Sequence, residues 1–235
     1  MRTNNKYYRL LNKTLKKNIN DTIRWLDSGE AIKFFVQRQD RLQTFFDESN
    51  LRQSLSKNGE SCYENAEELI TTIYNDGALR GYRELRTDRV FTNRDKATLN
   101  HLLDYNYDLI KSVNSDHILN IRESLIIGAV EGRHPSVIAK DILETTNLPG
   151  VNGLSPRLRA NMIARTETSR ALNEGAKNSY KNYGIEQVDL ITANDSSVCD
   201  LCLELEENNP HLIDELELPI HPNCRCGIKA HIINE

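Results

Sequence analysis

The sequence predicts a mainly α-helical protein, with a helical N-terminal region followed by a small α+β C-terminal domain that carries a zinc-knuckle-type Cys/His site. Apolar residues recur at helical spacing through most of the first 150 residues. A stretch with two prolines and two glycines, residues 147–156, then interrupts the pattern. After residue 184 the apolar residues follow strand periodicity, and four of the five cysteines cluster there.

The first 150 residues are expected to form six helices. Leu11, Leu15 and Ile19 mark the buried face of the first, over residues 8–26. The others are expected as follows: a second from Ser28-Gly29 to a stop at Lys57-Asn58-Gly59, a third over residues 62–85, a fourth opening at Asn93 or Asp95, a fifth capped by Ser115-Asp116 and ended by Gly132, and a short sixth starting at His134-Pro135. Cys62, on the third helix, is expected to be a packed small hydrophobe.

We place the domain boundary between residues 150 and 151, which gives a helical region, 1–150, and a C-terminal domain, 151–235. In the second part Ser155 caps a long helix, Pro156 occupies its first turn, and Gly184 ends it with positive φ. Residues 186–192 and 227–233 are short, β-branched and partly alternating, so each predicts a strand. The cysteine segment lies between the two strands.

Composition excludes several classes of protein. No apolar run reaches the length of a membrane helix, and the first twenty residues lack the apolar core of a signal peptide. We therefore expect a reducing cytoplasm, in which structural disulfides are disfavoured. The sequence also lacks a glycine-rich phosphate loop, a G-x-S-x-G elbow and an H-E-x-x-H zinc motif, so no catalytic residue is predicted.

The formal net charge of −4 is unevenly distributed. Residues 1–17 hold six basic residues and no acid, whereas residues 195–217 hold eight acids and no base. The acidic segment is a poor surface for DNA. The basic segment either contacts nucleic acid or an acidic partner, or is a solvated helix face. Its candidate contact residues are Lys6, Arg9, Lys13, Lys16 and Lys17.

Five residues have the spacing of a metal site. Cys199-x2-Cys202 is followed, after 18 intervening residues, by His221-x2-Cys224-x-Cys226. Two close pairs separated by 15 to 20 residues are typical of structural zinc, because each short turn brings two ligands to one tetrahedral ion. Five candidates compete for four positions, and we favour Cys199, Cys202 and Cys226, then His221 over Cys224. The alternatives are small buried residues or redox-sensitive thiols; a catalytic zinc would also need an open position and a general base.

The long helix that precedes these cysteines carries two polar faces. Arg165, Ser169 and Asn173 share one face at four-residue spacing. Glu167 lies on another face with Arg170 and can pair with it at i,i+3. Either these are surface salt bridges, or the Arg165 face hydrogen-bonds the loops that carry the cysteines.

The segments ARTETSRALNEG, YKNYGIEQVDLITANDSSVCDLC and PIHPNCRC, in this order, resemble the C-terminal domain of phage head-morphogenesis proteins, the Mu F-like minor head protein family. The resemblance spans residues 134–232. It is carried by Arg165-Thr166-Glu167, Asn173, Asp195 ahead of the first cysteine pair, and the closing His221-Pro222-x-Cys224-Arg225-Cys226.

The resemblance implies a structural, non-enzymatic component of a tailed phage or prophage head. The expected partners are the portal protein, the major capsid or scaffold protein, and phage DNA during packaging or ejection, with no membrane partner. The expected location is the host cytoplasm during assembly, then the head interior or portal vertex. Two alternatives remain: a zinc-knuckle nucleic-acid-binding module, and a metal-dependent nuclease or a transferase that uses Arg165 and Glu167.

Overall fold

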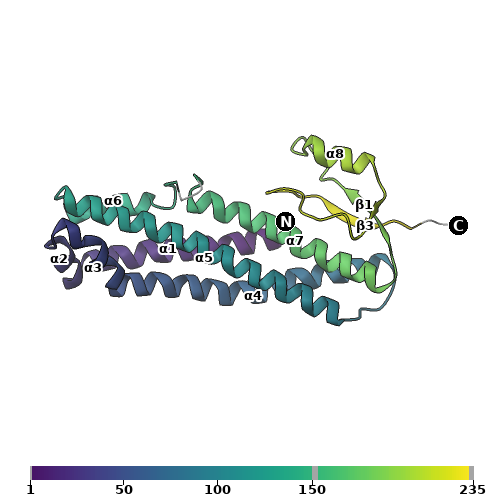
Figure 1. Cartoon of the computed structure of the whole chain (residues 1–235), viewed down its shortest axis with the longest axis horizontal. Coiled ribbons are helices and arrows are strands. Elements are labelled where there is room, and N and C mark those ends of the chain that lie inside the picture. Colours follow the sequence, from purple (N-terminus) through teal and green to yellow (C-terminus); the bar gives the residue numbers. More distant parts are fainter. Residues whose placement is uncertain (1, 150–152, 233–235) are drawn as a thin grey trace. The chain divides into compact units, whose positions relative to one another are not determined.

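The computed structural model describes residues 2–149 and 153–232, with side chains from residue 5 onward. In this part of the chain most residues are helical, and a three-stranded sheet lies near the C-terminus (Figure 1). The predicted fold class is confirmed. The elements are α1 (Arg2–Leu26), α2 (Gly29–Phe35), the 3-10 turn η1 (Gln39–Arg41), α3 (Leu42–Glu48), α4 (Asn50–Glu84), α5 (Asn93–Val130), α6 (Pro135–Glu144), α7 (Pro156–Asn182), β1 (Gln187–Ile191), α8 (Asp200–Glu207), β2 (His211–Leu212) and β3 (Gly227–Ala230).

Several predicted ends are confirmed by their capping contacts. His134 caps α6, whose first residue is Pro135, and the Ser155 hydroxyl accepts a hydrogen bond from the Leu158 N–H at the start of α7. Gly132 and Gly184 take φ of 64° and 73° just after α5 and α7.

The predicted second helix, from Ser28-Gly29 to Gly59, is wrong. The polar stretch after Phe35 breaks it into α2, η1 and α3, and Ser49 starts a new helix because its hydroxyl accepts the Arg52 N–H. That helix, α4, passes through the predicted stop. Glycine at position 59 makes room for the Asn114 side chain, because a Cβ here would lie 2.5 Å from it.

The predicted cap at Ser115-Asp116 is also wrong, because the fourth and fifth predicted helices are one helix, α5. Asp116 forms an ion pair with Arg159 of α7 instead of capping a helix. The two predicted strands are confirmed as β1 and β3, whereas α8 and β2 were not predicted.

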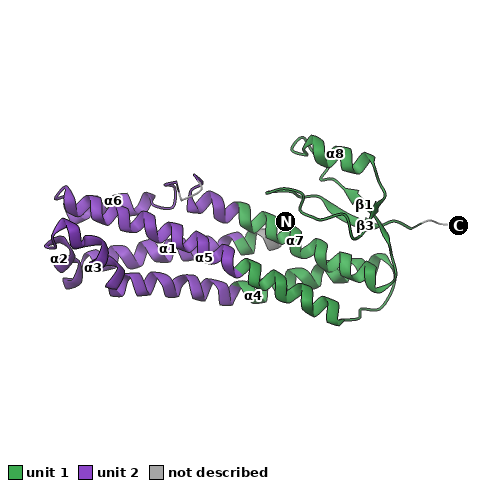
Figure 2. Ribbon diagram, viewed as in Figure 1, with its two compact units in different colours: residues 1–7, 66–106, 162–235 green, residues 8–65, 107–161 purple. Residues whose placement is uncertain are grey.

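The chain divides into two compact units, of residues 8–65 with 107–161 and of residues 1–7 with 66–106 and 162–235 (Figure 2). Each unit contains segments from both sides of residue 150. The predicted boundary itself falls on residues 150 and 151, outside the described residues. The division into regions 1–150 and 151–235 stays a prediction about how function is distributed.

The unit of residues 8–65 and 107–161 is a helical bundle. Its apolar core includes Trp25, Phe34, Phe46, Leu125 and Ile138. Four buried polar side chains of the same bundle, Asn18, Asn58, Asn114 and His117, are joined by hydrogen bonds through Asn18.

The unit of residues 1–7, 66–106 and 162–235 contains the sheet. Its strand order is β2-β1-β3, and both pairs are antiparallel. The buried face of the sheet packs on Ala176 and Tyr180 of α7 and on Cys202 of α8. Glycines let α7 approach α4 closely: a Cβ at Gly77 would lie 2.1 Å from the Leu172 carbonyl oxygen.

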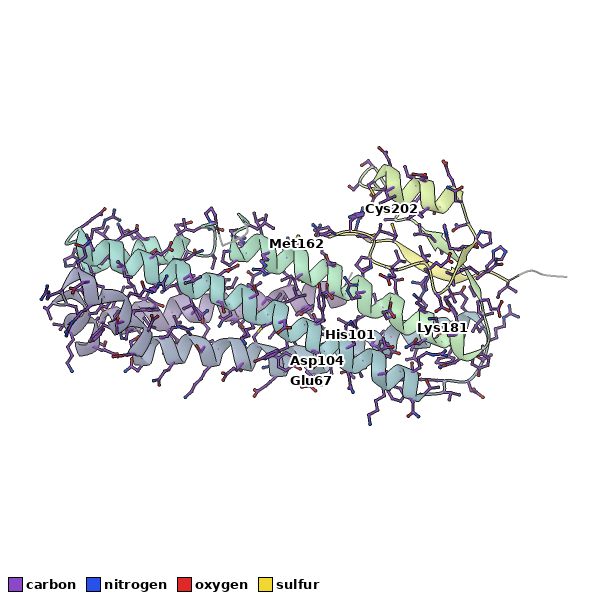
Figure 3. The ribbon with its side chains drawn as sticks, in the orientation of Figure 1. Glu67, His101, Asp104, Met162, Lys181 and Cys202 are labelled. Atoms are coloured by element: carbon purple, nitrogen blue, oxygen red, sulfur yellow. The ribbon has the colours of Figure 1, made fainter. Side chains whose placement is uncertain are left out.

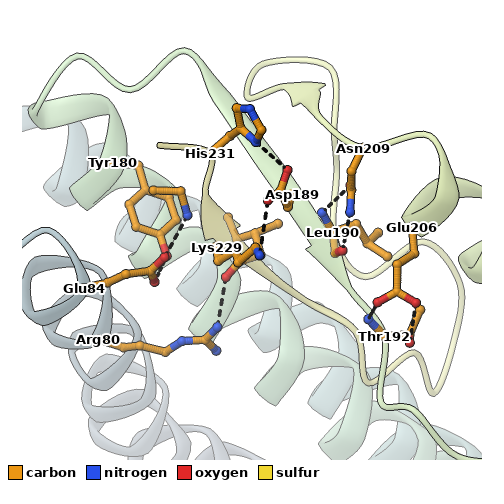
Figure 4. Close-up of polar contacts among 12 residues, drawn as sticks. Arg80, Glu84, Tyr180, Asp189, Leu190, Thr192, Glu206, Asn209, Lys229 and His231 are labelled. Atoms are coloured by element: carbon orange, nitrogen blue, oxygen red, sulfur yellow. Dashed lines mark hydrogen bonds and ion pairs between the residues drawn. The ribbon is translucent and has the colours of Figure 1, made fainter. Parts of the chain in front are cut away.

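The outer edge of β3 is covered by side chains of α4 (Figure 4). Arg80 donates to the Ile228 carbonyl at 2.9 Å, and Glu84 accepts the Ala230 N–H at 3.0 Å. The other carboxylate oxygen of Glu84 accepts the Tyr180 hydroxyl at 2.6 Å. Helical side chains thus replace the missing neighbouring strand.

Candidate metal centre

The five predicted metal ligands come from two loops that the fold brings together. Cys199 is the N-cap of α8 and Cys202 lies in its first turn, whereas the other three precede β3. Figure 3 shows Cys202 on α8. All five cysteines of the protein are free thiols.

The five donors form two triads that share Cys202. One triad is Cys199, Cys202 and His221; the other is Cys202, Cys224 and Cys226; within each, all ligand atoms lie within 4.8 Å of one another. The Nε2 atom of His221 lies 3.3 Å from the Cys199 sulfur and 3.5 Å from the Cys202 sulfur, and the sulfurs of Cys202 and Cys224 are 4.0 Å apart. Tetrahedral zinc with bonds of about 2.0 Å to nitrogen and about 2.3 Å to sulfur requires comparable separations.

The imidazole of His221 is oriented as a metal ligand. Its Nδ1 atom lies 2.9 Å from the carbonyl oxygen of Pro222. Because a carbonyl only accepts, Nδ1 carries a proton, and in the neutral imidazole Nε2 presents its lone pair to the two sulfurs. Metal-binding histidines are commonly held by such a hydrogen bond.

The two halves of the site differ in burial. Cys202, Cys224 and Cys226 are buried, and Cys199 and His221 are partly exposed. Burial raises the pKa of Cys202 above its usual range, whereas the backbone N–H of Cys202 lowers the pKa of Cys199. Cys199 and Cys202, which belong to the same triad, therefore differ in acidity.

Contacts outside the cluster fix the loop that carries Cys199 and Cys202. At the far end of α8, Glu206 accepts hydrogen bonds from both the N–H and the hydroxyl of Thr192, each at 2.8 Å (Figure 4). Asn209 then exchanges two hydrogen bonds with the backbone of Leu190, as a neighbouring strand would. These polar anchors were not predicted, since Glu and Asn in an acidic loop give no distinctive signal.

The loop before β3 is held by α7. The side chain of Asn173 donates to the Cys226 carbonyl at 3.1 Å. The Thr166 hydroxyl accepts the N–H of Asn223, a residue with φ of 65°. The face of α7 that carries Asn173 therefore does reach the cysteine loop.

The other predicted motif residues have separate roles. Asp195 forms a 2.6 Å ion pair with Arg225, which ties the two cysteine loops together. Glu167 is buried beside Arg170 at 3.1 Å, and its burial raises its pKa. Arg165 is exposed, and its side chain forms no ion pair or hydrogen bond with the described residues. The basic candidates Lys6, Arg9, Lys13, Lys16 and Lys17 are all exposed on α1.

Among the described residues, no helix is long and apolar enough to cross a membrane. Comparison with curated proteins and with solved structures gave no match. Residues 119–229 match the family described as Phage Mu protein F like protein. The match covers just under half of the chain, starts 15 residues before the stretch in which the resemblance was seen, and includes both cysteine pairs and His221. The resemblance is confirmed: the part of the chain from the second half of α5 to β3 matches the phage Mu protein F like family.

Proposed function

We propose that this protein is a minor head protein of a tailed phage or prophage, which acts during head morphogenesis. The observation that carries the proposal is the family domain over residues 119–229 together with its ordered motifs. In this role the protein assembles in the host cytoplasm and stays in the head interior or at the portal vertex. Its partners are the portal protein and the major capsid or scaffold protein.

We propose a structural role and no catalysis. Three of the carboxylates near the cysteine cluster are used in contacts that hold the fold, whereas Asp200 and Glu204 of α8 are exposed. Asp195 pairs with Arg225, Glu206 accepts two hydrogen bonds from Thr192, and Glu167 pairs with Arg170. A general base needs a carboxylate that can reach substrate.

We further propose that the cysteine cluster holds one structural zinc ion. Cys199, Cys202 and His221 supply three ligands, and Cys224 or Cys226 supplies the fourth. When bound, zinc would close a four-ligand shell between the α8 loop and the β3 loop, with release of thiol protons. Cys202 belongs to both triads, so every four-ligand set that contains a complete triad includes it.

Co-purification tests the head-assembly proposal. Proheads made with and without this chain are isolated by sedimentation, and their proteins are quantified by mass spectrometry. We expect to find the chain in the prohead fractions, and we expect purified portal oligomers to capture it. Recovery only as free protein, with normal proheads in its absence, would refute the proposal.

Elemental analysis of the purified protein tests the zinc site. We expect about one zinc per chain, lost in Cys202→Ser and retained in the control Cys62→Ser, which removes a buried thiol on α4 far along the sequence from the cluster. Zinc-free wild-type protein, or equal zinc in both variants, would contradict the assignment.

A further inference from the structure

Helix α1 lines an open groove in the unit of residues 8–65 and 107–161. The groove has a volume of about 1030 Å³. Residues of α1 line one side; residues from the end of α6, the turn after it and the start of α7 line the rest. Four of the five basic residues singled out in the sequence contribute to it, and Lys6 does not.

The lining is strongly cationic. It contains six basic residues and one carboxylate, that of Glu144. Five of the six come from α1 and one from the first turn of α7: Arg9, Lys13, Lys16, Lys17, Arg24 and Arg157. Two of these residues, Arg24 and Arg157, lie outside the basic segment that the sequence indicated.

Most of this charge is not neutralised within the protein. Among the described residues, Arg9, Lys13, Lys16 and Lys17 form no ion pair, and all four are exposed. Arg24 pairs with Asp21, at the far end of the row. Helix α1 has seven basic residues and this single acid.

The remaining basic residue, Arg157, lines the same groove as Tyr8. Its contact with the Tyr8 hydroxyl and its positive charge lower the pKa of Tyr8. The groove therefore combines cations with an aromatic side chain and with the amides of Asn12 and Asn20.

The cations form a row. Arg9 and Arg24 are fifteen residues apart, which is about 22 Å at the helical rise of 1.5 Å per residue. One nucleic-acid strand carries a phosphate about every 3.4 Å along a duplex axis, so the row can face several phosphates in succession. A small anion is a poorer fit as the ligand, because it would contact only one or two of these cations. A membrane is also a poorer fit, because a flat surface would not fill a groove.

We propose that this groove binds the phosphate backbone of nucleic acid, without reading its sequence. The charge spacing favours a regular linear polyanion over an acidic protein surface, whose carboxylates are irregularly placed. The proposal is independent of the zinc site, because the five candidate metal ligands all belong to the other unit.

The test measures binding of the full-length protein to a fluorescent 30-base-pair duplex of mixed sequence, between 50 and 300 mM salt. About five phosphate contacts predict a slope of log K against log salt of about −4 to −5 for a duplex. The groove variant Lys13→Gln/Lys16→Gln/Lys17→Gln should bind at least tenfold more weakly, with a slope shallower by about three. The charge-retaining Lys→Arg triple at the same positions should bind as the wild type does.

The matched control is Lys33→Gln/Lys57→Gln/Lys140→Gln. These lysines are also exposed, belong to the same unit and do not line the groove, so net charge changes equally. Unchanged salt slope in this control, with loss in the groove triple, supports the proposal. Equal loss in both triples, no duplex binding at 50 mM salt, or displacement by polyglutamate at an equal concentration of charge would each overturn it.

Discussion

The pH dependence of stability can be worked out from one buried histidine. His117 of α5 is fully buried, and burial lowers its pKa to about 3. Its hydrogen bonds explain why the imidazole ring cannot carry protons on both nitrogens without losing a partner. The Thr145 hydroxyl donates to the Ile142 carbonyl, so it can only accept from His117 Nε2 at 2.9 Å. The other ring nitrogen, Nδ1, faces the amide nitrogen of Asn18, which is a donor.

Protonation would therefore place two donors against each other inside the bundle. The unfolded chain binds a proton at His117 near pH 6.5, and the folded chain does so only near pH 3. Since the unfolded state holds more protons between these values, stability from this group is complete above pH 6.5 and is lost as pH falls toward 3. Between pH 7 and pH 5 the loss is about 2 kcal/mol.

The measurement is urea unfolding followed by circular dichroism at pH 7 and pH 5. The wild type should lose about 2 kcal/mol more than His117→Gln, in which the side chain is polar but does not titrate. A control, His101→Gln, removes an exposed histidine of the same helix (Figure 3) and should keep the wild-type pH dependence. If His117→Gln and the wild type lose the same stability, the buried neutral histidine is not the cause.

Two further substitutions test the packing around the sheet. Glu84→Ala leaves the Tyr180 hydroxyl and the Ala230 N–H without acceptors, which should cost about 1 to 3 kcal/mol of unfolding free energy each and speed hydrogen exchange in β3. The control Glu67→Ala, at an exposed position of α4 (Figure 3), should change neither the unfolding free energy nor the hydrogen exchange of β3. Gly77→Ala should cost about 1 to 3 kcal/mol of unfolding free energy by overpacking against α7, and a cost below a few tenths would refute the close approach.

Most of the fold could be predicted because apolar periodicity reports burial directly. The failures occurred where a tertiary contact overrides a local signal. Asn58-Gly59 has the chemistry of a helix stop, but Asn58 is buried against Asn18 and Asp21, and Gly59 accommodates Asn114. These contacts join residues 37 to 55 positions apart, so a local sequence pattern cannot predict them.

The candidate site shows the same division. Spacing predicted the five metal-ligand candidates, because short motifs report which donors one turn can bring together. It could not predict that Cys202 is shared by two triads, which depends on how α8 starts. Nor could it find Arg80 and Glu84, which lie about 146 residues before the strand that they cover.

The covered edge of β3 bears on where this domain begins. The family match starts at residue 119, yet the side chains that saturate the last strand come from α4, which ends at Glu84. A fragment cut at the match would expose the backbone of a short strand to any other chain with a free edge, and edge-to-edge association is the expected result. The segment that matches the family is therefore shorter than the segment needed to cover every strand edge of the sheet, because the latter also includes α4.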